Sequence, residues 1–111
     1  MILIVPNFLR VIGGKYVNAM AVWPFILVRH REVKESEVII HHEKIHFRQQ
    51  KELLIILFYI LYGYYYALYR LNGYTHFNAY MSIPFEKEAY SNESNFDYLK
   101  GRKFWAWTQF I

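Results

Sequence analysis

The sequence of 111 residues contains no cysteine. This absence excludes disulfide bonds, zinc sites built from thiolates and a thiol nucleophile, although it does not fix the cellular compartment. The chain also lacks internal repeats and low-complexity linkers. A chain of this length can bury one hydrophobic core but is too short for two. We therefore expect a single domain over residues 1–111.

Clustered positive charge is a second feature that the sequence lacks. The net charge is +4, but the lysines and arginines are scattered, and no zinc-finger, homeodomain or RNA-recognition pattern is present. We therefore expect no nucleic-acid partner. The apolar start, MILIVPNFLR, has no charged leading region and is interrupted by Pro6 and Asn7, so it is not typical of a signal peptide. A cytoplasmic or peripheral membrane location is expected.

Apolar residues make up 55% of the chain and aromatic residues 21%, which is typical of a folded protein. Residues 3–12 and the stretch from Tyr16 onward predict two strands around the Gly13–Gly14 turn. Residues 19–29 predict a further strand. It contains Pro24, which cannot donate a ladder hydrogen bond, so we expect an edge strand of a short antiparallel sheet.

The rest of the chain predicts helices. Ser36 is a good N-cap for a helix over residues 37–50. Another helix is expected from Pro84 to Lys100, ending at Gly101, because proline is tolerated in the first turn and glycine is common just after the last. His30 and His76 are expected in loops. The predicted fold class is α+β and mostly helical.

Residues 42–46 read His-Glu-Lys-Ile-His, an HExxH motif on the first of these helices. His42 and His46 are four residues apart, so both imidazoles project from one face and can bind one Zn²⁺. Glu43 lies where its carboxylate can act as a general base. His41 lies about 140° round the helix from His46, which favours a bystander on the surface or behind the site.

A catalytic zinc needs a third protein ligand and one open position. The helix that begins at Pro84 offers Glu86 and Glu88, which diverge by about 160° on a helix, so only one of them can face the metal. Glu88 borders the apolar stripe of this helix, whereas Glu86 lies in its first turn, where a carboxylate can bind free backbone N–H groups. We therefore favour Glu88 as the third ligand and keep Glu86 as the alternative.

The segments HEKIHFRQQ and PFEKEAY together resemble the gluzincin class of zinc peptidases, the class of thermolysin, and small bacterial proteins of the zincin type. The resemblance implies a zinc helix and a glutamate helix in a zincin-like domain. It also implies an aspartate four residues after the glutamate, supporting the first histidine. Here Asn92 stands at that position after Glu88 and cannot supply the carboxylate.

The resemblance implies a hydrolase, a zinc metalloprotease that cleaves peptide bonds with Glu43 as general base and Zn²⁺ as cofactor. A peptide or protein substrate could add to the strand at residues 19–28 by backbone hydrogen bonds. An ordinary packing role for that strand is an equal alternative. The alternative function is a non-catalytic, zinc-stabilised scaffold.

Residues 53–69 form an uncharged, tyrosine-rich stretch between the two motifs. Three interpretations compete: a buried helix bent near Gly63, an exposed arm that meets a membrane surface or forms a homo-oligomer, and a membrane span. Whole-chain hydropathy near zero suits a soluble or peripheral protein. Phe104, Trp105 and Trp107 would suit either an interfacial anchor or a lid on the core.

Overall fold

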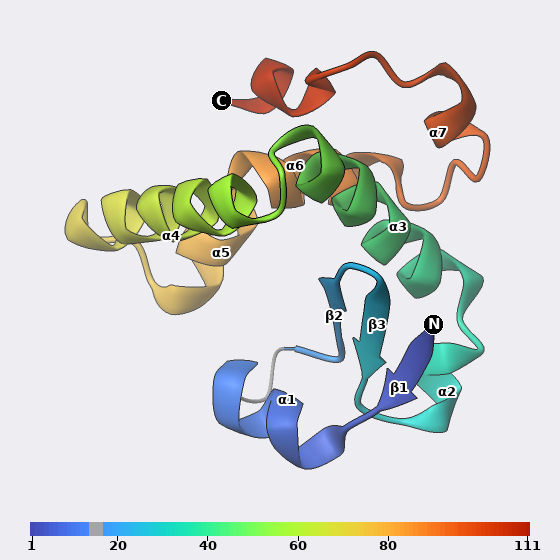
Figure 1. Ribbon diagram of the computed structural model, residues 1–111. Helices are drawn as coiled ribbons and strands as arrows, with labels where there is room; N and C mark the ends of the chain where they lie inside the picture. Colours follow the sequence, from blue (N-terminus) through green and yellow to red (C-terminus); the bar gives the residue numbers. More distant parts are fainter. Residues whose placement is uncertain (14–16) are drawn as a thin grey trace.

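The computed structural model describes residues 1–13 and 17–111. It is mostly helical with a small sheet near the N-terminus (Figure 1), which confirms the predicted α+β class. The elements in chain order are β1 Ile2–Ile4, α1 Pro6–Gly13, β2 Ala19–Val22, β3 Phe25–Val28, α2 Arg31–Lys34, α3 Glu37–Glu52, α4 Ile56–Leu71, α5 His76–Ser82, α6 Pro84–Asn92, α7 Tyr98–Gly101 and the 3-10 helix η2 Ala106–Phe110.

The sheet is mixed rather than antiparallel. Its central strand, β3, pairs in parallel with β1 and antiparallel with β2. The single strand predicted over residues 19–29 is wrong, because Pro24 lies in the turn between β2 and β3, where it needs no ladder hydrogen bond. Only β2 of this hairpin is an edge strand.

The strand predicted over residues 3–12 is also wrong beyond Ile4. Helix α1 begins at Pro6, a residue that suits the first turn of a helix. The predicted glycine turn involves Gly14, and the following strand begins at Tyr16; both residues lie outside the described part of the chain.

Helix α3 is the centre of the structure and begins as predicted. The Ser36 hydroxyl accepts a hydrogen bond from the backbone N–H of Ile39 at 3.3 Å. Two apolar clusters flank the helix. One joins the sheet and α2 through Ile26, Val28 and Val33. The other lies among α4, α6 and η2 and contains Leu53, Phe58, Ile83, Phe85 and Trp107.

The chain turns sharply between α3 and α4, whose axes differ by 111°. Leu54 and Ile55 take positive φ angles of 55° and 65° at this break. Such angles are unusual for residues with large side chains, and neither residue is a recognisable helix stop in the sequence. The bend predicted at Gly63 is therefore wrong, because Gly63 lies inside α4.

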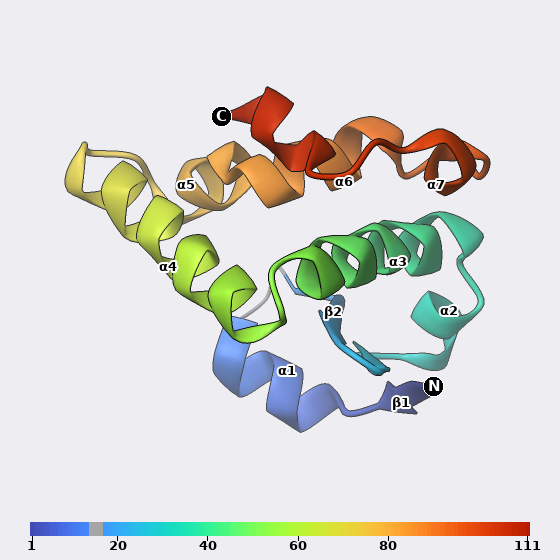
Figure 2. The ribbon, with the colours of Figure 1, turned by 45° about the horizontal axis from the view of Figure 1, so that its top comes forward.

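Helix α4 projects as an arm that packs on α5 (Figure 2). Phe58 is its only buried residue, so the arrangement matches the exposed arm rather than the buried core helix. Within the described residues, no single helix has both the length and the apolar character needed to cross a membrane. The pair α3 and α4 meets these criteria together, but with the 111° bend between them.

The helix predicted from Pro84 to Lys100 is two helices, α6 and α7, separated by a turn after Asn92. His76 begins α5 instead of lying in a loop, because Thr75 caps that helix through the N–H of Asn78. The aromatic C-terminus covers the core: the rings of Trp107 and Phe85 lie 4.7 Å apart, measured between centroids. This contact matches the lid interpretation for Trp107.

A buried ion-pair network holds the C-terminal segment against α3 and α6. The Arg102 guanidinium donates hydrogen bonds to Glu88 at 3.0 Å and to Glu52 at 2.7 and 3.0 Å. All three side chains are nearly or completely buried. Removal of the cation would leave two carboxylates without their partner inside the protein.

Substitution of Arg102 by methionine is expected to lower the free energy of unfolding by about 3–5 kcal/mol, because it leaves buried carboxylates uncompensated. Urea unfolding monitored by tryptophan fluorescence measures this change. Lys100→Met is the matched control, since the Lys100–Asp97 pair is exposed and is expected to contribute little. Equal losses in the two variants would contradict a structural role for the buried network.

Candidate metal centre

The structure brings together three buried donor residues from two helices. His42 and His46 project from α3, and Glu86 projects from the first turn of α6. One oxygen of Glu86, Oε1, lies 3.1 Å from His42 Nε2 and 3.0 Å from His46 Nε2. Tetrahedral zinc with bonds of about 2.0–2.1 Å separates its donor atoms by about 3.3 Å, so the spacing suits such an ion.

The other nitrogen of each imidazole is already engaged. His42 Nδ1 lies 2.8 Å from Glu93 Oε2, and His46 Nδ1 lies 2.7 Å from Gln49 Oε1. The Gln49 amide is oriented by its own nitrogen, which donates to Phe85 O and Glu88 Oε1. Both Nδ1 atoms therefore act as donors.

A neutral imidazole that donates from Nδ1 has a lone pair on Nε2. Both Nε2 lone pairs then face the same Glu86 oxygen, which repels them unless a cation lies between. A proton or a metal ion satisfies this requirement, and two imidazole nitrogens with a carboxylate are donors that zinc accepts. His42, His46 and Glu86 thus fit a metal ion, and their ligand atoms lie within 4.8 Å of one another.

The pKa values of the group reflect this arrangement. Burial alone would lower the pKa of His46, but the Glu86 carboxylate outweighs it and raises the pKa to about 9. Burial would raise the pKa of Glu86, but His46 and His42 hold it well below its ordinary value. The site therefore attracts positive charge to the space between the imidazoles and the carboxylate.

Glu88, the favoured third ligand in the sequence, does not join the two histidines. Its carboxylate accepts hydrogen bonds from Arg102, Tyr98 and Gln49, on the other side of α6. The structure thus places Glu86, the alternative, at the histidine pair. Glu88 does point inward, as its position beside the apolar stripe predicted, but Arg102 neutralises its charge.

Asn92 does not support a histidine either. Its side-chain amide donates to the backbone oxygen of Glu88 within the same helix. The carboxylate that supports His42 comes instead from Glu93, one residue later and seven residues after Glu86. Glu93 is the residue that follows α6 and keeps helical backbone angles, so it lies on the same side as Glu86, because seven residues make two helical turns. This spacing is the signal that could have identified Glu93.

Glu43 lies beside the group without joining it. Its Oε2 is 4.0 Å from His42 Nε2, and the side chain is buried. Burial raises the pKa of Glu43, and the nearby histidines lower it only in part. A carboxylate with a raised pKa at this position can accept a proton from a molecule that binds next to the histidines.

His41 lies apart from the group, as predicted. Its Nδ1 lies 3.0 Å from the backbone oxygen of Glu93, and its ring contacts the edge of Phe96. His41 is buried rather than on the surface. It therefore belongs to the packing between α3 and the segment after α6.

The apolar helix α4 contributes a residue that the sequence did not identify. The Tyr62 hydroxyl donates a hydrogen bond of 2.7 Å to Glu86 Oε2. Burial and the Glu86 charge raise the pKa of Tyr62 well above its ordinary value, so Tyr62 stays a donor. This bond fixes the Glu86 carboxylate so that its other oxygen, Oε1, faces the histidines.

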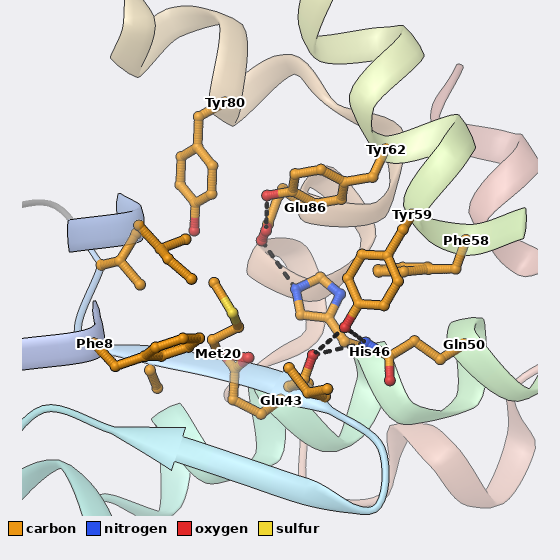
Figure 3. Close-up of a pocket in the computed structure, with 15 residues that line it drawn as sticks. Phe8, Met20, Glu43, His46, Gln50, Phe58, Tyr59, Tyr62, Tyr80 and Glu86 are labelled. Carbon is orange, nitrogen blue, oxygen red and sulfur yellow. Dashed lines mark hydrogen bonds and ion pairs between the residues drawn. The ribbon is translucent and has the colours of Figure 1, made fainter. Parts of the chain in front are cut away.

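We call His42, His46 and Glu86 the metal-ligand group, because they are the candidate ligands. A cavity of about 440 Å³ opens beside this group (Figure 3). Glu43, His46, Gln50 and Glu86 form its polar wall. The remaining wall is mostly apolar and comes from α1, β2, the segment just before β2, α4 and α5. Its members are Phe8, Ile12, Val17, Ala19, Met20, Ala21, Val22, Phe58, Tyr59, Tyr62 and Tyr80. The dimensions suit a large apolar group placed next to Glu43.

The edge strand is partly occupied by the protein itself. The Gln50 amide accepts from Trp23 N–H at 3.0 Å and donates to Ala21 O at 2.8 Å, as a neighbouring peptide group would. Tyr59 also donates to Ala21 O. A peptide therefore cannot pair along the whole predicted range 19–28. Gln50 occupies the polar groups of Ala21 and Trp23, and β3 already has a neighbouring strand on each side. Only the part of β2 before Ala21 is left for such pairing.

Comparison of the chain with known protein families, with curated proteins and with solved structures found no match.

Zinc content is expected to separate the two glutamates. His46→Ala and Glu86→Gln should lose bound zinc because each removes a donor, whereas Glu88→Gln should keep it. His41→Ala is the matched control, since it removes an adjacent histidine whose ring faces Phe96. Elemental analysis after dialysis against a zinc buffer measures the stoichiometry. Zinc loss in Glu88→Gln but not in Glu86→Gln would contradict this assignment.

Glu93→Gln is expected to weaken zinc binding about 10- to 100-fold, because an amide no longer supports the His42 imidazole with a negative charge. Competition with a fluorescent zinc chelator measures the affinity. Asn92→Ala, which alters the neighbouring position, should leave the affinity nearly unchanged. A larger effect in Asn92→Ala would restore that residue as the support of the histidine.

Proposed function

We propose that this protein is a zinc-dependent peptidase in which His42, His46 and Glu86 bind the metal and Glu43 is the general base. The observation that carries the proposal is the position of Glu43. It lies at the end of the metal-ligand group and also lines the adjoining cavity. A substrate in that cavity would thus lie between the metal-ligand group and a carboxylate able to move a proton.

The donor set supports a catalytic rather than a purely structural metal. Structural zinc sites are closed by four protein ligands, whereas catalytic sites use three and keep one position open. Three donors converge here within the described residues. A zinc ion bound by them would polarise a carbonyl group and lower the pKa of a bound water.

Glu43 carries the proton transfer. Its carboxylate takes a proton from the attacking water and returns it to the nitrogen of the leaving amine as the peptide bond breaks. Burial raises its pKa, which favours holding that proton between the two steps. His42 and His46 keep their Nε2 atoms in position because Glu93 and Gln49 bind the opposite ring nitrogens.

Tyr80 and Tyr90 are the candidates for donating a hydrogen bond to the developing oxyanion. The hydroxyls of Tyr80 and Tyr90 lie 2.9 Å apart, and the Tyr90 ring packs edge-on against His42. Tyr80 reaches into the cavity that Glu43 lines (Figure 3). We assign the donor role to Tyr80, because Tyr90 can hold its hydroxyl in place.

The cavity wall indicates the class of peptide. Its apolar residues favour a substrate with a large apolar side chain next to the bond that is cleaved. The part of β2 before Ala21 could align the peptide backbone through hydrogen bonds. Both features lie on the same side of the metal-ligand group, since β2 and Glu43 line one cavity.

The second candidate function is a zinc-stabilised scaffold that binds a membrane surface or a protein partner without catalysis. The exposed apolar residues of α4 favour it. A scaffold does not require Glu43 to line a cavity beside the metal ligands, whereas a peptidase does. The two candidates therefore differ in what Glu43 contributes.

Glu43→Gln is expected to lower kcat for peptide hydrolysis at least about 100-fold, because the amide cannot take a proton from water. A library of fluorogenic peptides with apolar residues at successive positions, assayed with the zinc-loaded protein, measures the rate. Zinc content and the thermal midpoint of unfolding of Glu43→Gln provide the controls and should match those of the wild type.

Unchanged hydrolysis in Glu43→Gln would exclude Glu43 as the general base. Absence of cleavage by zinc-loaded wild-type protein across the library would favour the scaffold. In the latter case Glu43→Gln would change neither the activity nor the bound zinc.

A further inference from the structure

A second cavity adjoins the one beside the metal-ligand group. Its volume is about 240 Å³, and its wall comes from the first half of α3, from the residues around the start of β2 and from tyrosines of α5 and α6. The two cavities have four lining residues in common, which are Val17, Ala19, Glu43 and Tyr80. They therefore meet at the carboxylate that we propose as the general base.

The metal-ligand group belongs to both cavities. His46 and Glu86 line the larger cavity, whereas His42 lines the second one. The space between these three ligands thus lies at the junction of the two cavities. A chain molecule whose reacting bond lies at this junction extends into one cavity on each side of the bond, unless the chain ends there.

The edge of β2 offers a place for the backbone of such a chain. Asn18 O accepts a hydrogen bond of 2.8 Å from Arg29 N–H. Bonded positions alternate with free ones in an antiparallel pair, so the next residue, Ala19, directs its N–H and C=O away from β3. These two groups have no hydrogen-bond partner among the described residues. Ala19 lines both cavities and can therefore align a peptide across their junction.

The second cavity carries negative charge. Asn18 and Glu93 contribute polar side chains to it, and its described lining contains no lysine or arginine. Glu93 Oε2 binds His42 Nδ1, whereas the other oxygen, Oε1, has no partner among the described residues. The Glu93 side chain is 25% exposed, so a bound molecule can reach it. A cationic group would complement this oxygen.

The position of Glu93 keeps such a group away from the metal. Glu93 binds Nδ1 of His42, whereas Glu86 faces Nε2 on the opposite side of the ring. The imidazole therefore separates the Glu93 carboxylate from the space between the ligands. A positive side chain next to Glu93 would not compete with a metal ion for its ligands.

We propose that a peptide substrate lies across both cavities and is cleaved within its chain, with a large apolar side chain in the larger cavity and a lysine or arginine side chain in the second. The inference rests on the proposed peptidase function and adds the residue on the other side of the cleaved bond. The C–N bond breaks and a C–O bond forms, and water supplies the hydroxyl of the new carboxyl group and the proton of the new amine.

Peptide binding to zinc-loaded Glu43→Gln tests the inference without turnover. The first set of fluorescent peptides has blocked ends and one phenylalanine, with lysine, methionine or glutamate at successive positions on either side of it. The second set has a free α-amino group and no lysine. Fluorescence polarisation measures Kd. The best lysine peptide should bind about fivefold more tightly than its methionine counterpart, and salt should reduce this difference.

Asn18→Lys and Gln109→Lys, each combined with Glu43→Gln, form a matched pair. Asn18 lines the second cavity, so Asn18→Lys should abolish the preference for lysine and Asn18→Asp should increase it. Gln109 is exposed in η2, which contributes no residue to either cavity, so Gln109→Lys should keep the preference. Circular dichroism and zinc content confirm that the variants are folded and loaded.

The inference is overturned if the lysine, methionine and glutamate peptides bind equally, or if Gln109→Lys removes the preference as fully as Asn18→Lys does. Tighter binding of the peptides with a free α-amino group than of every blocked lysine peptide would also overturn it, because the cation would then be the end of the chain. These failures are distinct from failure of the proposed function, which depends on whether the zinc-loaded wild-type protein cleaves any of the peptides.

Discussion

The burial of a polar helix face between two apolar clusters is the constraint on which the structure depends. His42, Glu43, His46, Gln49 and Gln50 of α3 are all at most 5% exposed. Each buried polar group requires a partner, because an unpaired one costs roughly 1–3 kcal/mol. The partners come from α6 and the residue after it and from the β2–β3 hairpin, which explains why these distant segments pack against a single helix.

Helix α6 meets this requirement with two glutamates that point to different sides. Glu86 faces the histidines and is fixed from behind by Tyr62, whereas Glu88 faces Arg102 and is shared with Gln49. Gln49 connects the two sides because it orients His46 while it binds Glu88. The Gln49 side-chain amide therefore links the Glu88–Arg102 ion pair to His46 through hydrogen bonds.

The sequence was sufficient for the features that depend on local spacing. The pairing of His42 with His46, the position of Glu43 beside them and the Ser36 cap all follow from the geometry of one helix. The choice between Glu86 and Glu88 does not, since both are buried and the outcome depends on Arg102, which is distant in sequence. The break at Leu54 and Ile55 was missed because neither residue is a glycine or a proline.

Gln50 of α3 has an effect outside the candidate metal centre. An exposed edge strand can pair with strands of other chains and so promote aggregation. At the end of β2, the Gln50 amide occupies the hydrogen-bonding positions that an incoming strand would use on Ala21 and Trp23. A side chain of α3 thus blocks growth of the sheet at this point, so the helix that carries the two histidines also protects this edge.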